Sequence, residues 1–223
     1  MKNQDPSQEQ LQSVLNLYTH GKLQQALSES SQMLERFPNS VVLYNISGAS
    51  NAALKRFDAA IDSYKQALRI KPDYADVHNN MGSVMKDKGD LNEAIDCYKQ
   101  TIRIRPDYAA AYYNMGNSLS DKGNLNEAIE CYKKAILIKP DYVNVHNNMG
   151  AALQLLNQNE LAQASYEKAI SLKKDFSHAI SGLGIVLLKQ GKHSEGLDKL
   201  IQGEGSILFS IKRGFSVKSG VKE

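Results

Sequence analysis

The residues whose type and spacing suggest chemistry are asparagines that recur at one position of the chain. Asn80, Asn114 and Asn148 are spaced 34 residues apart, and Asn79 and Asn147 directly precede two of them. A carboxamide has two N–H donors and a carbonyl acceptor, so it can hydrogen-bond to the backbone of an extended peptide whatever the peptide's side chains are. Asparagine is a poor helix former, so its repeated use in predicted helices needs a reason. The pattern predicts a peptide-binding surface, and the alternative is that each amide bonds to a neighbouring helix and fixes its position.

The sequence contains no recognisable catalytic constellation. The patterns GxGxxG, GxxxxGK[ST], HExxH and GxSxG are all absent, and the two cysteines lack the CxxC spacing of a zinc site. His78 and His146 lie two repeats apart, at a position that predicts packing rather than metal binding. We therefore expect no catalytic residue, no metal and no cofactor, and we predict that the chain is not an enzyme.

The asparagines belong to a segment that the chain repeats almost word for word. Residues 75–108 are followed by a close copy in residues 109–142. Two columns of identical residues show the period of 34: Gly48, Gly82, Gly116, Gly150 and Gly184 in one, and Pro38, Pro72, Pro106 and Pro140 in the other. Self-similarity at a fixed period is typical of repeat arrays, in which each unit buries its core against its neighbours. The chain is thus predicted to be one continuous array.

Each repeat is predicted to contain two helices joined by a turn. The turn falls at Gly89, Gly123 and Gly191, with Asn157 and Lys55 at the same position of two other repeats. Gly or Asn just past a helix is typical of the left-handed conformation that ends it. The second helices are expected to begin near Asp58, Asn92, Asn126 and Ser194, whose side chains can cap free amides.

Glycines inside the first helices predict close packing. Gly82, Gly116 and Gly150 each give up about 1 kcal/mol of helix propensity, which a close helix approach must offset. The expected counterparts are small residues of the second helices, Ala60, Ala94, Ala128 and Ala162.

The predicted organisation is an array with a short tail at either end. Residues 1–6 are expected to be a disordered tail. The array occupies residues 7–203, as repeats 7–40, 41–74, 75–108, 109–142 and 143–176 and a degenerate capping repeat from 177. Residues 204–223 are predicted to be a C-terminal extension or linker, whose ILFSI run covers the last helix or belongs to something further on.

These columns resemble the tetratricopeptide repeat (TPR) family over about residues 7 to 203. The glycine, alanine, aromatic and proline positions recur in register, although tyrosine, histidine or isoleucine stands where the family often has tryptophan. The resemblance implies an all-α fold, a TPR α-solenoid in which antiparallel helix pairs form a right-handed superhelix and the first helices line a concave groove for peptides or partner proteins. The asparagine series is similar to the ladder in the TPR superhelix of O-linked N-acetylglucosamine transferases.

TPR co-chaperones that grip a terminal carboxylate use lysine and arginine on this same face. The matching positions here hold Asn45, Asn79, Tyr113, Asn147, Asp76 and Asn144, with no basic residue among them. A carboxylate clamp is therefore disfavoured.

Helical periodicity defines the candidate peptide-binding face. At about 100° per residue, the polar side chains of each first helix fall on one side and the packing residues on the other. The predicted peptide-binding residues are Asn79, Asn80, Asn114, Asn147, Asn148, Tyr113, Asp76, Asn117, Asp87 and Asp121. The aspartates among them favour a basic ligand, and the tyrosine supplies an aromatic contact.

Composition restricts the classes of partner and the compartment. The net charge is +3 with 23% charged residues, a balance that argues against nucleic acid as a partner. A ridge of basic residues near the second-helix ends, including Arg69, Arg103 and Lys139, is interpreted as complementing helix dipoles. No stretch is apolar enough for a signal peptide or a membrane span, so a cytoplasmic location without membrane contact is expected. Cys97 and Cys131 fall in one column of neighbouring repeats and are predicted to be free thiols.

The predicted function is a non-enzymatic protein-interaction scaffold that binds an extended peptide or partner segment in the concave groove. Two alternatives remain: a substrate-recruiting N-terminal module of a larger enzyme, either a transferase or an oxygenase, and self-association through a bare terminal helix. The protein or peptide ligand itself is not specified by any motif.

Overall fold

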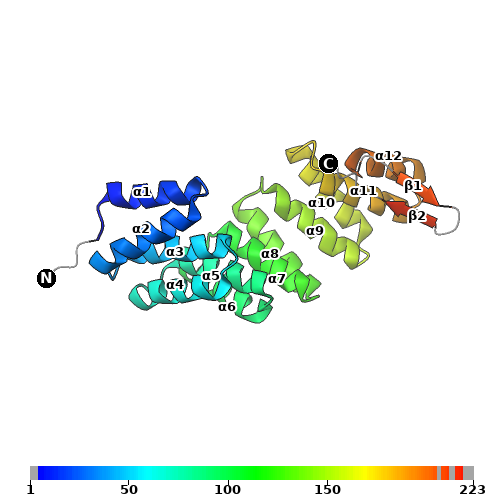
Figure 1. Cartoon of the computed structure of the whole chain (residues 1–223). Helices are drawn as coiled ribbons and strands as arrows, with labels where there is room; N and C mark the ends of the chain where they lie inside the picture. Colours follow the sequence, from blue (N-terminus) through cyan, green and yellow to red (C-terminus); the bar gives the residue numbers. More distant parts are fainter. Residues whose placement is uncertain (1–4, 205–206, 211–213, 218–223) are drawn as a thin grey trace. The chain divides into compact units, whose positions relative to one another are not determined.

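The computed structural model describes residues 5–204, 207–210 and 214–217. In this part of the chain, twelve α-helices are followed by a two-stranded hairpin (Figure 1). The helices are α1 (Gln8–Thr19), α2 (Leu23–Arg36), α3 (Val41–Ala53), α4 (Phe57–Ile70), α5 (Ala75–Lys88), α6 (Leu91–Ile104), α7 (Ala109–Asp121), α8 (Leu125–Ile138), α9 (Val143–Leu155), α10 (Asn159–Leu172), α11 (Ser177–Lys189) and α12 (His193–Glu204). No helix of the described residues is both long and apolar enough to cross a membrane.

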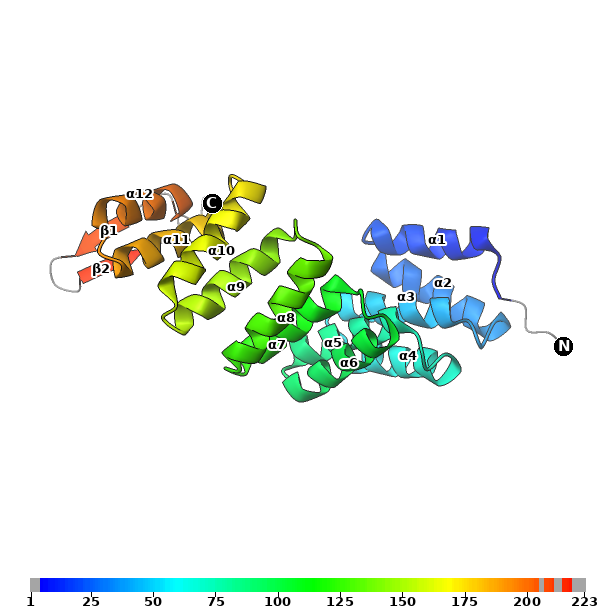
Figure 2. The ribbon, with the colours of Figure 1, turned by 180° about the vertical axis from the view of Figure 1, so that it is seen from behind.

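Helices that follow one another in the chain pack together. The pairs α3–α4, α5–α6, α9–α10 and α11–α12 are in contact, and each second helix also contacts the first helix of the next pair where both lie in one unit. Figures 1 and 2 both show α11 between α10 and α12, which illustrates this stacking. The predicted all-α solenoid of helix pairs is thereby confirmed.

The helix ends follow the turn residues in the sequence. The backbone φ is positive at Gly89 (96°), Gly123 (82°) and Gly191 (82°), and also at Lys55 (61°) and Asn157 (56°). The left-handed turns were therefore placed correctly. The predicted caps were wrong: the N-cap residues of α4, α6 and α8 are Arg56, Asp90 and Asn124, and none makes a side-chain cap bond.

The chain divides into two compact units, residues 1–118 and 119–223, with the boundary inside α7. In the first unit, one core cluster forms around Val14, Ala26, Leu43 and Ile46. A second cluster contains Ala60, Ile61, Tyr64, Ala67, Val77 and Val84. The second unit buries residues of α9 to α12 that include Leu153, Tyr166, Leu183 and Leu200. Each unit thus has its own apolar core.

Tyrosines of the second helices, rather than alanines, cover the first-helix glycines. A β-carbon on Gly82 would lie 2.7 Å from Cε1 of Tyr98, and one on Gly150 would lie 2.9 Å from Cδ1 of Tyr166. Tyr98 is only 1% exposed. The glycine is needed because a flat ring packs directly on the helix backbone, so the prediction of close packing is correct and its predicted alanine partner is not.

The last described segment is a small antiparallel hairpin. Strands β1 (Ile207–Ser210) and β2 (Gly214–Val217) pair from Ile207 opposite Val217 to Ser210 opposite Gly214, and β1 lies beside α12. The sequence had assigned these residues to an extension or linker and had not predicted strands. The hairpin is an addition to the all-α solenoid.

Candidate functional site

The predicted asparagines of the first unit form hydrogen-bonded pairs between successive first helices. Asn80 Nδ2 on α5 donates to Asn45 Oδ1 on α3, and Asn114 Nδ2 on α7 donates to Asn79 Oδ1 on α5, each at 3.1 Å. Asn79 is buried, whereas Asn80 and Asn114 are half-buried. These pairs match the structural alternative considered for the amides. They use one of the two N–H groups of Asn80 and of Asn114.

A cavity of about 320 Å³ opens on this face of the first unit. It is lined by Tyr18 from α1, Ala49, Ala52 and Ala53 from α3, Lys55 from the turn, Tyr64 from α4, and Asn80, Ser83, Val84 and Asp87 from α5. The alanines of α3 are small, so the cavity has open space beside the polar residues Asn80 and Ser83 of α5. Lys55 and Asp87 bring one charge of each sign to the lining.

Hydrogen bonds fix the polar side of this cavity. Ser83 Oγ donates to the Asn79 carbonyl at 3.2 Å and accepts from the Tyr98 hydroxyl at 3.4 Å. Burial raises the pKa of Tyr98 to about 12, so this hydroxyl stays protonated as a donor at neutral pH. The second N–H and the Oδ1 of Asn80 have no hydrogen-bond partner in the part of the chain that the structure describes. Asn80 is thus held in place and still has bonding capacity for a ligand.

Asp76 was predicted to favour a basic ligand, but the structure gives its carboxylate a partner within the chain. Arg105 donates to it in a bidentate pair at 3.2 and 3.1 Å, and the Tyr108 hydroxyl donates at 2.9 Å. Burial, followed by the bond to Asp76, raises the pKa of Tyr108 to about 12. This arrangement links the start of α5 to the end of the same repeat, so Asp76 has a structural role in the described chain.

The remaining predicted site residues lie outside this cavity. Tyr113 and Asn117 are half-buried and Asp121 is exposed, and all three have interactions within the chain. In the second unit, Asn147 Nδ2 donates to Asn148 Oδ1 at 3.0 Å, and Asn147 Oδ1 is buried without a hydrogen-bond partner among the described residues. Of the predicted site residues, the cavity therefore contains Asn80 and Asp87.

Sequence reasoning missed part of the lining. Tyr18 comes from the first repeat, in which Val14 replaces the recurring glycine, so its alignment with the other repeats is less clear. Lys55 stands where four other repeats have glycine. The one available signal was that a lysine replaces glycine at a left-handed turn. Ser83 was not included among the predicted site residues.

The basic ridge and the histidines have partners within the chain. Lys71, Arg105, Lys139 and Lys173 each lie over the aromatic ring three residues further on, at 4.7 to 5.5 Å from its centre. His78 Nε2 and His146 Nε2 lie 2.9 Å from the carbonyls of Pro72 and Pro140. The ring contacts lie within the end of one repeat, and the histidine contacts join the start of one repeat to the end of the one before it. Both support the structural interpretation of these residues.

The cysteines are buried and free, as predicted. Burial raises the pKa of Cys97 and of Cys131 to about 11, which leaves little thiolate at neutral pH. In the described ranges, no group of three or more His, Cys, Asp or Glu side chains is arranged to hold a metal ion.

Family models decide the classification. A TPR repeat model matches residues 51–89, 82–123 and 116–157, and a tetratricopeptide repeat model matches residues 143–176. Together these matches cover more than half of the chain. The chain belongs to the tetratricopeptide repeat family. Within a TPR solenoid, the asparagine pairs and the cavity lie on first helices, the elements that the resemblance assigns to ligand binding.

A curated relative of this TPR chain is the probable UDP-N-acetylglucosamine–peptide N-acetylglucosaminyltransferase SEC of Arabidopsis thaliana. The two are 35% identical over 74 residues, which are 33% of this chain and 8% of the relative. The match thus spans less than a tenth of the transferase.

Two solved structures show the same fold. The type IV pilus biogenesis factor PilW superposes with a TM-score of 0.80 at 19% identity, covering 90% of this chain and 94% of PilW. YrrB, described as a TPR protein with an unusual peptide-binding site, has a TM-score of 0.66 at 15% identity, covering 79% of this chain and 91% of YrrB. At these identities the likeness concerns the fold alone.

Proposed function

We propose that this TPR chain is a non-enzymatic scaffold that binds an extended peptide or partner segment on the first-helix face of its first unit. The observation that carries the proposal is the cavity in which Asn80 is fixed by Asn45 and retains a donor and an acceptor. A peptide backbone presents the complementary acceptor and donor at each residue. The description of YrrB as peptide-binding supports the same use of the fold.

The lining favours recognition of backbone over recognition of one side-chain type. Alanines leave space above Asn80 and Ser83, and the single charges of Lys55 and Asp87 have opposite signs. A site of this kind has little net charge preference and gains its affinity from hydrogen bonds, each of which contributes about 0.5–1.5 kcal/mol net. Peptides with different side chains are therefore expected to compete for it.

The test uses peptides selected from a phage-displayed random library against the whole chain. Binding of the selected peptides is measured by isothermal titration calorimetry, and each is remade with N-methylated backbone amides. If the site recognises backbone, N-methylation at one or two positions abolishes binding while changes of side chain at the same positions do not. Selected peptides whose affinity is insensitive to every N-methylation would contradict the proposal.

Asn80→Ala and Asn45→Ala separate ligand binding from helix stacking. Both variants lose the bond between α3 and α5, so their melting temperatures should change by similar amounts. Only Asn80→Ala also removes the groups offered to the ligand, so it alone should weaken peptide binding, by about 2- to 12-fold for one hydrogen bond. Gln100→Ala on the exposed surface of α6 is the control. Equal affinities of the two asparagine variants would assign Asn80 a purely structural role.

A second candidate function is that of a substrate-recruiting module of a larger glycosyltransferase. The observation that favours it is the 35% identity to SEC over 74 residues. The size of the endogenous protein, measured by immunoblot with an antibody against the array, tests this proposal. A band at 24.7 kDa, the mass of this chain, would exclude it, whereas a much larger band would support it.

A further inference from the structure

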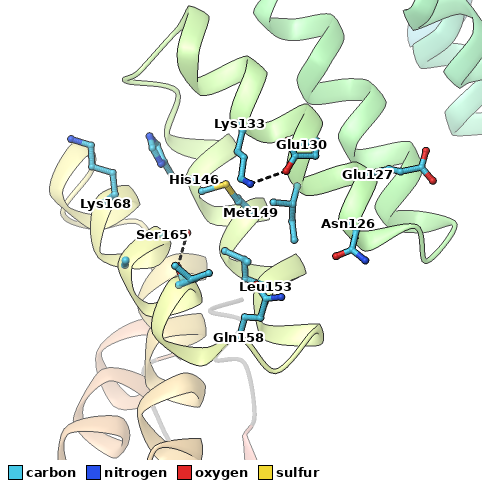
Figure 3. A pocket seen from close by; sticks show the side chains of 13 residues that line it. Asn126, Glu127, Glu130, Lys133, His146, Met149, Leu153, Gln158, Ser165 and Lys168 are labelled. Atoms are coloured by element: carbon cyan, nitrogen blue, oxygen red, sulfur yellow. Dashed lines mark hydrogen bonds and ion pairs between the residues drawn. The ribbon is translucent and has the colours of Figure 1, made fainter.

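The second unit contains a larger groove that includes none of the predicted site residues. Its volume is about 660 Å³, and it lies between the outer faces of two second helices, α8 and α10, above α9 (Figure 3). Its lining comprises Asn126, Glu127, Ile129, Glu130 and Lys133 of α8, His146, Met149 and Leu153 of α9, and Gln158, Leu161, Ala164, Ser165 and Lys168. On α9, Asn148 lies two residues from His146, about 200° around the helix, so this groove is on a different face from the asparagines.

The groove is apolar because this pair of repeats departs from the others at surface positions. Leu161 occupies the column of Glu93 and Glu127, and Ala164 occupies the column of Asp96 and Glu130. Leu137, which follows Lys133 by four residues and so continues the same stripe of α8, replaces the arginine found at the equivalent positions 69 and 103. The columns of Ala164 and Leu137 are apolar only here, and the column of Leu161 is otherwise apolar only at Ala59, a much smaller side chain.

These leucines do not serve the core of the unit. Leu161 is 58% exposed and Leu137 is 75% exposed, whereas Leu153 at the floor of the groove is 5% exposed. Glutamate or arginine at these positions would form the helix equally well and would be better solvated. The exposed leucines therefore have a use other than stability of the isolated chain.

Charge is distributed unevenly along the groove. Glu127 lies near the start of α8. Lys133 comes seven residues after Asn126 on α8, and Lys168 comes seven residues after Leu161 on α10, so both lysines lie toward the other end of the groove. Lys133 is paired with Glu130 at 2.7 Å, whereas Lys168 has no ion-pair partner in the ranges that the structure describes. From Leu161 to Lys168 the groove extends about 10 Å, the rise of two helical turns.

We propose that this groove binds an amphipathic helix of a partner protein. The helix places leucine-like side chains of one face between Leu161, Ala164 and Met149. It carries an acidic residue at the end that meets Lys168 and a basic residue at the end that meets Glu127. Its apolar contacts repeat every three or four residues over about two turns, which matches the length of the groove.

A synthetic helix of about 14 residues, lactam-bridged to fix its fold, provides the probe. It has leucines on one face, an acidic end and a basic end, and it is made with both orders of charge because the groove does not specify the direction of the helix. A matched pair of peptides has serine in place of the leucines. Binding is followed by the methyl NMR signal of Met149 in the full chain, with Met81 of the first unit as the internal reference.

We expect one charge order to shift the Met149 signal and leave the Met81 signal unchanged, and the serine peptides to bind at least tenfold more weakly. Leu161→Glu introduces the acid that three other repeats have, as Glu93, Glu127 and Glu195, and should weaken binding at least tenfold. Gln163→Glu makes the same charge change on another face of α10 and should leave binding unchanged. Leu161 is exposed, so Leu161→Glu should melt with the parent. Gln163→Glu loses a hydrogen bond to Glu167, so its melting temperature is measured beside its binding.

Three results would overturn the proposal. The first is no shift of the Met149 signal by either leucine peptide at about 1 mM. The second is equal binding by the Leu161→Glu and Gln163→Glu variants. The third is a Met149 signal that moves when the protein alone is diluted, together with a concentration-dependent mass in light scattering, because the occupant of the groove would then be a second copy of the chain.

Discussion

Three glycines of the first helices are explained by the tyrosine that each one meets: Gly48 meets Tyr64, Gly82 meets Tyr98 and Gly150 meets Tyr166. Gly82→Leu would force a side chain into the ring of Tyr98, which is buried and has no room to retreat. Overpacking of this kind costs about 1–3 kcal/mol and outweighs the gain of about 0.8 kcal/mol in helix propensity. We expect a lower urea midpoint for Gly82→Leu. Ala59→Leu, on the exposed side of α4, is the control and should leave the midpoint almost unchanged.

The buried thiols make the stability of the chain depend on pH in the alkaline range. Burial raises the pKa of Cys97 and Cys131 from 9.0 to about 11, so the folded state retains protons that the unfolded state loses. The associated stability is fully present below pH 9 and is lost as pH rises toward 11. At pH 10 the loss should be about 1 kcal/mol per thiol.

Replacing both thiols by serine tests this pH dependence. Two other repeats have serine at the position of these cysteines, Ser63 and Ser165. Each of these hydroxyls donates to a backbone carbonyl at 2.8 Å. Thermal melting of the parent and of the double variant Cys97→Ser, Cys131→Ser should give a difference that changes in favour of the variant between pH 8 and pH 10. A constant difference over this range would mean that the thiols do not ionise with the raised pKa.

For single residues, the sequence predicted the side of the helix on which a side chain lies better than the residue with which it pairs. The periodicity placed Asn80 and Asp87 on one side of their helix, and both line the same cavity. It did not reveal that Asp76 is paired with Arg105, because the two are 29 residues apart and the contact depends on how the two helices of one repeat pack. Partners on different helices follow from three-dimensional packing rather than from the period of one helix.

For the elements, the turns between helices show what glycine contributes. Four turns have glycine at positive φ, whereas Lys55 and Asn157 adopt the same conformation with a β-carbon present. A residue with a β-carbon destabilises the fold by about 1–2 kcal/mol when it adopts the left-handed conformation. Glycine avoids this cost, but its greater freedom in the unfolded chain destabilises the fold by about 0.4–1 kcal/mol.

Reciprocal exchange of turn residues tests this balance. Gly89→Lys should lower the free energy of unfolding by about 1 kcal/mol, and Lys55→Gly should raise it by a similar or smaller amount. The gain is smaller because Lys55 also lies 5.7 Å from the centre of the Phe57 ring, a contact that glycine would lose. Urea unfolding of both variants measures the two changes. Effects of the same sign would show that the turn conformation does not control them.

The sequence predicted the helix pairs and their turns because the 34-residue period repeats several times. It failed for the last elements. The repeat from residue 177 was interpreted as degenerate, but a β-carbon on its Gly196 would lie 2.9 Å from the Gly184 carbonyl, so this glycine allows α11 and α12 to approach closely. The hairpin that follows occurs once in the chain, so no period could reveal it.

For the whole molecule, the sequence predicted one continuous array, whereas the structure divides into two compact units. The repeats continue in sequence through α7, but each unit has its own buried core. In repeat proteins, stability is the sum of the repeats and of the contacts between neighbours, so a weakened repeat can unfold without the distant ones. Sequence identity between repeats could not predict where the two compact units divide, since the division depends on packing.

Hydrogen exchange on the Gly82→Leu variant tests whether the two units unfold independently. The substitution damages the contact between α5 and α6 in the first unit and touches no described residue of the second. Amides of α3 to α6 should therefore lose protection, by about 5- to 150-fold for a loss of 1–3 kcal/mol. Amides of α9 to α11 should retain the protection of the parent. The mirror variant Gly150→Leu, which meets Tyr166, should reverse the pattern. An equal loss of protection in α3 to α6 and in α9 to α11 for both variants would show that the chain opens as a single cooperative unit, because only then does damage in one core lower the free energy of opening everywhere.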